Sequence, residues 1–348
     1  MKKNQESQFH PKRRGWAIGV GILLVLFIFL SSLRFGSRDS SFSELLFAFF
    51  RDFFPGSTGE EDAFTLLVIR ERLPRTVFSL VAGASLSVSG CLMQTVTKNP
   101  IADPGILGVN MGASFAVVIG MVFFRIQDPL SFILFALAGA LITSLAVYAI
   151  ASIGPGGASP IKLALAGSAT ALILSSLVTM LILPDNNVMD QFRFWQVGSV
   201  GRAEWSGILL LLPFLVVGWI LAFALSPRLN ALELGDDLAT GLGVNVIRTR
   251  FLAALAASLL CGGVTAIGGP IGFVGLMVPH LVRLLIGPDL RWVLPLSALF
   301  GAGLLTLSDV LGRLIARPAE VEVGILTALL GAPMLIAVTI RMKKGGGE

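Results

Sequence analysis

The chain has 348 residues, of which 55% are hydrophobic and only 14% are charged, and its formal net charge is +5. This composition and a mean hydropathy of +0.85 exclude an ordinary soluble domain, in which about a quarter of the residues are charged. The composition therefore predicts an integral membrane protein. The basic clusters that binding of nucleic acid would need are absent. The two cysteines and two histidines are too isolated to hold a metal ion, and we expect neither a metal site nor a cofactor.

The N-terminal segment 1–14 carries five lysine and arginine residues and precedes an uncharged run from Gly15 to Leu33. That run is long enough to span a membrane and too long for the core of a secretory signal. We therefore expect a retained first span with residues 1–14 in the cytoplasm. The polar section 34–71 is expected outside the membrane, where a capping box at residues 41–44 predicts an amphipathic interfacial helix.

Nine further apolar runs follow the first one. They lie at 76–97, 105–124, 130–152, 161–183, 207–226, 251–268, 274–286, 292–316 and 323–340. Together they predict an all-α integral membrane protein with about ten transmembrane helices in one domain, residues 15–342, and a tail at 343–348. Lysine and arginine are somewhat more frequent in the segments that this topology places inside, which agrees with two cytoplasmic termini. We expect a multi-pass membrane protein.

Two segments interrupt the apolar pattern in the second half of the chain. The segment 268–273 contains three glycines and a proline, which predict irregular backbone at membrane depth, enclosed by protein or by a watery cavity. The polar segment 227–250 contains Asp236, placed to cap a short helix, and Gly243, placed to end it in a left-handed conformation. Leucine recurs at every fourth residue from 234 to 242, so this helix has an apolar face. The pattern leaves open whether that face rests on protein and lipid or binds a cytoplasmic partner.

The apolar runs also bear on the energy source. We expect no Asp, Glu, Lys or Arg in the runs before Asp309, and this argues against a carrier driven by protons or sodium, because such carriers keep ionisable groups at mid-membrane. The chain lacks the glycine-rich loop that holds ATP phosphates and shows no nucleophile–base pair, so we expect no enzyme. A pathway powered by another subunit fits these features. Composition alone leaves a channel as an alternative.

An ordered set of motifs then suggests a family. The motifs are RLPR at 72–75, AGASLSVSG with Gln94, KNPIADPGILG, FWQVGSVGRAEW, LGDDLATGLGV, GPIGFVGLMVPHLVR, DVLGR and GILTALLGAP. Together they resemble the FecCD family, the permease subunits of ATP-binding-cassette importers for ferric siderophores, haem and cobalamin. The resemblance covers nearly the whole chain from about residue 66. It implies a bundle like that of the cobalamin-importer permease, in the bacterial cytoplasmic membrane.

The resemblance also implies partners and a cargo. Two copies of a separate ATPase are expected inside, a substrate-binding protein or lipoprotein outside, and a second permease subunit, identical or paralogous, alongside. Membrane lipid surrounds the subunit, and nucleic acid is not expected. Ferric siderophore is the favoured cargo, with haem and cobalamin permeases as alternatives that share the motifs. An ion-coupled carrier is the rival class.

Roles for particular residues follow from the same resemblance. The ATPase-coupling helix corresponds to Gly235, Asp236, Ala239, Leu242 and Gly243. The residues expected to face the binding protein are Arg72, Arg75, Arg313 and Glu320. The candidates for the gate or pathway are Ser159, Pro160, Gln94 and Asn99. The chain departs from the family at Pro160, where relatives can carry a second hydroxyl residue, and at Glu322, which replaces a common proline of the outer turn.

Overall fold

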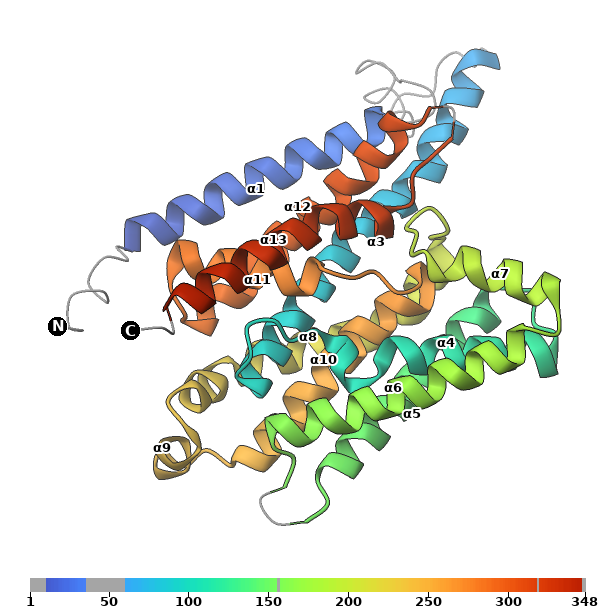
Figure 1. The fold of residues 1–348 in the computed structure, drawn as a ribbon. Coiled ribbons are helices and arrows are strands. Elements are labelled where there is room, and N and C mark those ends of the chain that lie inside the picture. Colours follow the sequence, from blue (N-terminus) through green and yellow to red (C-terminus); the bar gives the residue numbers. More distant parts are fainter. Residues whose placement is uncertain (1–10, 36–59, 155–156, 318, 346–348) are drawn as a thin grey trace.

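A computed structural model describes residues 11–35, 60–154, 157–317 and 319–345, and all regular structure that these residues form is helical (Figure 1). The helices in chain order are α1 (Pro11–Arg34), α3 (Glu60–Thr97), η3 (Pro104–Leu107), α4 (Val109–Ile119), η4 (Gly120–Phe124), α5 (Pro129–Ala151), α6 (Pro160–Ile182), α7 (Asn186–Gln196), α8 (Trp205–Glu233), α9 (Asp236–Gly241), α10 (Val246–Gly268), α11 (Val274–Ile286), α12 (Leu290–Ile315) and α13 (Val323–Gly345). The interfacial helix predicted after residue 41 lies outside the described residues.

The apolar runs predicted from the sequence form the long helices of the bundle. Within the described residues, 7 helices are long and apolar enough to cross a membrane. Three shorter apolar helical stretches, Val109–Phe124, Val274–Ile286 and Val323–Ala337, accompany them. The prediction of an all-helical membrane protein is therefore confirmed.

Two boundaries differ from the sequence prediction, and one helix was not predicted. α8 does not stop at residue 226 but continues through Pro227 to Glu233, so the first part of the expected loop 227–250 is helical. α3 begins at Glu60, which assigns residues 60–71 to a helix rather than to an outer loop. The short helix α7 was not predicted. α8 and α3 continue into polar sequence, where hydropathy no longer marks the end of a helix.

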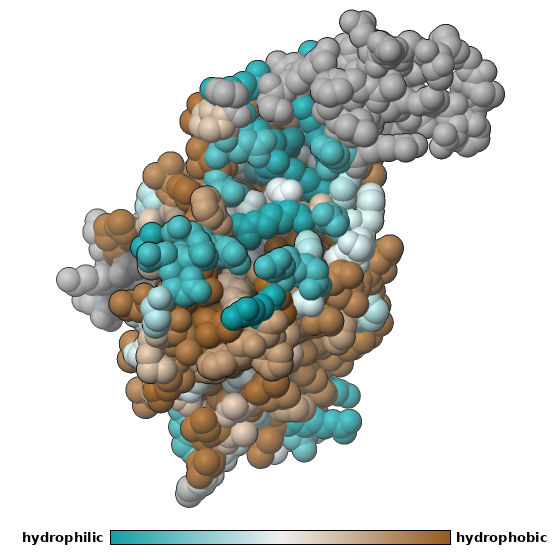
Figure 2. All heavy atoms as spheres, turned by 90° about the vertical axis from the view of Figure 1, so that its right-hand side faces the viewer, coloured by the Kyte–Doolittle hydropathy of each residue, from teal (hydrophilic) through white to brown (hydrophobic). Residues whose placement is uncertain are grey.

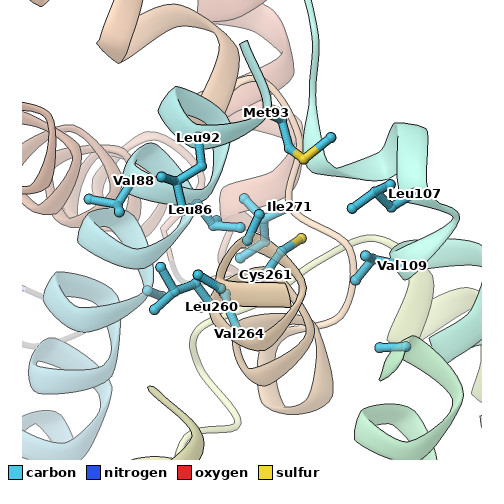
Figure 3. Close-up of a cluster of buried hydrophobic side chains, with 14 of the residues drawn as sticks. Leu86, Val88, Leu92, Met93, Leu107, Val109, Leu260, Cys261, Val264 and Ile271 are labelled. Atoms are coloured by element: carbon cyan, nitrogen blue, oxygen red, sulfur yellow. The ribbon is translucent and has the colours of Figure 1, made fainter. Parts of the chain in front are cut away.

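α3 and α10 form the centre of the bundle. Their apolar spans are each 83% buried, whereas the span in α6 is only 11% buried. Figure 3 shows Leu86, Val88, Leu92 and Met93 of α3 close to Leu260, Cys261 and Val264 of α10, in one cluster of buried side chains. The two helices are also hydrogen-bonded, because the hydroxyl of Ser89 donates to the carbonyl of Ala257 at 2.7 Å.

Glycines allow the helices to approach each other closely. A Cβ atom added to Gly90 of α3 would collide with the backbone of Gly275 in α11, and one added to Gly83 would collide with Gly301 in α12. α4 and α5 meet in the same way at Gly112. Small residues at such crossings let backbones touch in lipid, where apolar side chains give little net driving force for association.

The predicted break at residues 268–273 is confirmed. α10 ends at Gly268 and α11 begins at Val274, with positive φ angles at Gly269 (+69°) and Phe273 (+69°) between them. The segment after α7 covers this break, since the N–H of Ser199 donates to the carbonyl of Gly268 at 2.7 Å. Protein therefore supplies part of the enclosure that irregular backbone needs at this depth.

The molecule has two distinct ends (Figure 1). α9 lies at the end where α1 begins and α13 finishes, and α7 lies at the opposite end. We call these the α9 end and the α7 end. Figure 2 faces the α7 end and shows hydrophilic residues gathered there, with hydrophobic residues around and below them.

Candidate functional site

α9 is a six-residue helix between α8 and α10, and glycines shape both of its ends. Gly235 precedes it with φ +115° and Gly243 follows it with φ +79°, conformations that residues with a side chain rarely adopt. The N–H of Gly243 donates to the carbonyl of Thr240 at 2.9 Å. The prediction for Gly243 is confirmed. The N-cap position, however, belongs to Gly235 and not to Asp236.

The predicted apolar face of α9 is turned away from the rest of the chain. Leu234, Leu238 and Leu242 are 61%, 62% and 65% exposed. Ala239, by contrast, is fully buried and packs toward the bundle. Large apolar side chains grouped on a polar end of a protein commonly mark a contact surface. We call Leu234, Leu238 and Leu242 the leucine face.

Asp236 forms ion pairs in place of the predicted cap. Its carboxylate accepts a hydrogen bond from Lys98 Nζ at 3.0 Å and two from Arg250 Nη2, at 2.9 and 2.8 Å. Desolvation by burial acts to raise the pKa of Asp236, but the hydrogen bonds and charges of Lys98 and Arg250 outweigh it and hold the pKa below its ordinary value. The sequence prediction missed both cations. They were visible only as isolated charges beside apolar runs.

The gate candidates Ser159, Pro160 and Asn99 lie in capping and turn positions at the α9 end. Ser159 is the N-cap of α6, where its hydroxyl accepts from the N–H of Lys162, and Pro160 is the first residue of that helix. Asn99 is exposed in the turn after α3, and its side-chain oxygen accepts from the N–H of Ile101 at 3.1 Å. Their roles in a gate stay predictions.

Gln94 lies inside the bundle and joins α3 to α11. It is 3% exposed, and its amide donates to the carbonyl of Gly275 at 3.3 Å. Its side-chain oxygen accepts from Arg283, which also donates to Thr95 Oγ1 at 3.2 Å. The expectation that the apolar runs before Asp309 contain no Asp, Glu, Lys or Arg is wrong, because Lys162 lies within α6 and Arg283 lies within α11. The neutral partners of Arg283 on α3 satisfy part of its guanidinium group.

A network of ionic groups lies at the other end of the bundle. Arg75 of α3 donates to Asp309 of α12 from Nη2 at 2.6 Å and from Nε at 3.0 Å, and to Glu320 at 2.7 Å. Arg313 pairs with the second oxygen of Asp309 at 2.8 Å. Two cations and two anions therefore neutralise one another within the chain, and we call these four residues the ion network.

Two arginines hold the C-terminal end of α1. Arg72 donates to the carbonyl of Leu33 at 3.0 Å, and Arg313 donates to the carbonyls of Ser32 and Phe35 at 3.0 and 2.9 Å. The last carbonyl groups of a helix lack partners within it and carry partial negative charge, which a guanidinium can satisfy. These contacts attach α1 to α3 and α12.

Arg72 and Arg313, which were expected to face a binding protein, are only 8% and 2% exposed. Among the residues predicted to face a binding protein, Arg75 and Glu320 are more exposed, with side chains 17% and 38% accessible. A docking role for any of the four stays a prediction, and the geometry favours this pair.

A cavity of about 540 Å³ opens beside α7, which the sequence analysis did not anticipate. Met121, Ile133 and Trp195 are buried side chains of its lining, and Gln127 and Arg202 are exposed ones. The cavity therefore combines an apolar floor with a polar rim at the α7 end.

The comparison with protein families shows to which family the chain belongs. Residues 23–341 match the FecCD transport family. The chain belongs to this family. The match extends further toward the N-terminus than residue 66, where the recognisable motifs begin, and so it includes the second half of α1.

Individual FecCD relatives are similar over nearly their whole length. The chain is 44% identical over 328 residues to the ferric enterobactin transport system permease protein FepD of Escherichia coli, covering 94% of this chain and 96% of FepD. It is 37% identical to the hemin transport system permease protein HmuU of Yersinia pestis, covering 93% of this chain and 96% of HmuU. A solved metal-chelate type ABC transporter in an inward-facing conformation has a TM-score of 0.79 and 29% identity, covering 94% and 99% of the two chains.

Proposed function

We propose that the chain is the membrane-spanning permease subunit of an ATP-binding-cassette importer that takes up ferric siderophores. The relatives named for ferric enterobactin and for Fe(3+)-citrate are 44% and 43% identical to it, which favours an iron(III) chelate as cargo. The observation that carries the proposal is the leucine face of α9. A permease that draws its energy from another subunit needs a surface on which that subunit acts. The 37% identity with a hemin permease makes haem the second candidate cargo.

The proposed membrane topology uses ten crossings. The long apolar helices supply seven, and the three shorter ones supply the rest, in a bundle of the kind found in cobalamin-importer permeases. α11 has 13 residues and reaches only about 20 Å, less than the ~30 Å hydrocarbon core, so the irregular segment before it would complete its crossing. Positive charge in residues 1–14 supports a cytoplasmic α9 end with both termini on that side.

The proposed partners occupy the two ends. Two ATPase subunits would bind the α9 ends of two permease subunits, with Gly235, Ala239 and Gly243 shaping the helix that they contact. An extracytoplasmic binding protein would dock at the α7 end, where Arg75 and Glu320 are the accessible members of the ion network. ATP hydrolysis itself belongs to the ATPase, because this sequence has no phosphate-binding loop.

The test is transport by the purified complex in vesicles. The permease and its ATPase are reconstituted with the binding protein. Uptake of radiolabelled iron is measured with ferric enterobactin, ferric citrate or hemin outside, and uptake of radiolabelled cobalt is measured with cobalamin outside. We expect uptake of a ferric siderophore that requires ATP and persists when the proton gradient is collapsed. Uptake driven by a pH gradient without ATP would overturn the proposal, and ATP-driven uptake of hemin alone would replace its cargo.

A further inference from the structure

α9 touches the rest of the protein through few side chains. A Cβ atom added to Gly235, Gly241 or Gly243 would meet no atom within 4 Å, so open space surrounds these positions. The leucine face is exposed, and Ala239 is a small apolar contact. Apart from its chain connections, α9 is therefore held mainly by the ion pairs of Asp236.

The two cations that hold Asp236 stand at the ends of the two central helices. Lys98 directly follows Thr97, the last residue of α3, and adopts φ +50°, which is unusual for a residue with a side chain. Arg250 lies near the start of α10 and is 6% exposed. Asp236 thus joins α9 to two separate elements, one of them through a buried guanidinium.

α3 and α10 are the helices through which a displacement of α9 would reach the centre of the bundle. Their spans are the most buried of the seven, at 83% each. They contact each other directly, as the hydrogen bond from Ser89 to Ala257 shows. Because close-packed interiors have low compressibility, they transmit strain from one packed helix to the next.

We propose that Asp236 is a positioning residue that transmits movement of α9 to α3 and α10 together, so that ATP hydrolysis by the partner is converted into transport. This inference rests on the proposed function, in which α9 receives the ATPase. The carboxylate does not face the ATPase as part of the leucine face. It connects α9, which contacts the ATPase, to the buried helices α3 and α10. Removal of this carboxylate therefore uncouples ATP hydrolysis from transport.

The experiment compares the Asp236→Asn and Asp237→Asn variants with the wild-type importer, each reconstituted with the ATPase and the binding protein. Asn keeps the size of the side chain but removes the charge that pairs with Lys98 and Arg250, and Asp237 is the exposed neighbour on the same helix. For Asp236→Asn we expect ATPase binding and ATP hydrolysis to stay within about twofold of wild type, while uptake per ATP falls by about tenfold or more, within the range of ordinary coupling effects. Asp237→Asn should keep the wild-type ratio.

Two further variants separate transmission from simple loss of structure. Lys98→Gln removes only the link to α3 at a side chain that is 40% exposed, and it should lower uptake per ATP by a smaller factor without reducing the yield of folded protein. Asp236→Glu restores the charge and should recover part of the coupling. The proposal is overturned if Asp236→Asn keeps a normal ratio of uptake to ATP, or if it loses transport only because the ATPase no longer binds. A wild-type importer without ATP-driven uptake would instead refute the proposed function.

Discussion

The two ends of the molecule differ in which side chains they bury and which they expose. At the α7 end, the ion network and Arg72 place charged side chains inside the chain, with partners from α1, α3 and α12. At the α9 end, the leucine face presents apolar side chains to the surroundings. In the sequence, an arginine next to a membrane span suggests a partner on another protein. The structure shows that partners within the chain can account for it instead. The α9 end, where its own chain leaves the leucine face uncovered, is therefore the end that we propose as the docking site.

The largest expected effect of a single change is on the ion network. Asp309 is 2% exposed and pairs with both Arg75 and Arg313, so Asp309→Ala leaves the buried guanidinium of Arg313 and the partly buried one of Arg75 without that carboxylate. Removing one partner of a buried ion pair costs about 3–5 kcal/mol. We expect a large fall in the thermal unfolding temperature of the purified protein in detergent.

The control for this prediction is an exposed pair. Arg193 and Asp190 lie 3.7 Å apart with side chains 66% and 64% accessible, and such pairs are worth about 0–1 kcal/mol. Asp190→Ala should therefore leave the unfolding temperature almost unchanged. Equal unfolding temperatures for the two variants would show that the ion network is not what holds the α7 end together.

The next largest effect is expected at the leucine face. Leu238→Glu places a charge at the centre of the surface proposed to bind the ATPase, and a central apolar contact in an interface is worth about 2 kcal/mol or more, roughly 30-fold in affinity. The thermal stability of the permease alone should not change, because Leu238 is 62% exposed. Co-purification with the ATPase measures the effect. Retention of the ATPase at the wild-type ratio would argue against this surface.

Gly243→Val tests the shape of the same region with a smaller expected effect. Gly243 has φ +79°, and the left-handed region costs residues with a side chain about 1–2 kcal/mol. We expect affinity for the ATPase to fall by about tenfold while the membrane bundle stays folded. Gly241→Ala is the matched control, since Gly241 is the last residue of α9 and open space surrounds it. Equal losses in both variants would point to a requirement for glycine that is unrelated to φ.

The smallest effect is expected at Glu320. Its side chain is 38% accessible, so its pair with Arg75 at 2.7 Å contributes only about 0–1 kcal/mol to stability. Glu320→Gln should leave the unfolding temperature nearly unchanged and should alter affinity for the binding protein by less than about tenfold, more at low salt than at high salt. A large loss of stability would place Glu320 with Asp309 as a structural residue.

The sequence predicts the apolar helices well because hydropathy reports directly on the surroundings of a span. It predicts the break before Val274 for a similar reason, since clustered glycine and proline disfavour regular helix. It also predicts Gly243, where only backbone freedom matters. In these cases the information lies within a few neighbouring residues.

Pairings between distant residues could not be predicted in this way. Lys98 and Asp236 are 138 positions apart, and Arg313 and Ser32 are 281 positions apart. A lone charge at the end of an apolar run looks the same whether it faces water, lipid headgroups or a carboxylate from another helix. The sequence therefore does not indicate that Arg72 and Arg313 donate to carbonyl groups at the end of α1. It also suggests Asp236 as the cap of α9, whereas the N-cap residue is Gly235.

The most direct test of the contrast between the two ends is the reactivity of single introduced cysteines. Both native cysteines are buried, so Leu238→Cys and Glu320→Cys each add one accessible thiol to the part of the chain that the structure describes. The rate of maleimide labelling is measured by mass spectrometry with and without the ATPase bound. We expect the rate at position 238 to fall by about tenfold or more on ATPase binding, as for a residue in the water-excluded centre of an interface, with no comparable change at position 320. An unchanged rate at position 238 would contradict the assignment of the leucine face as the surface that receives the ATPase.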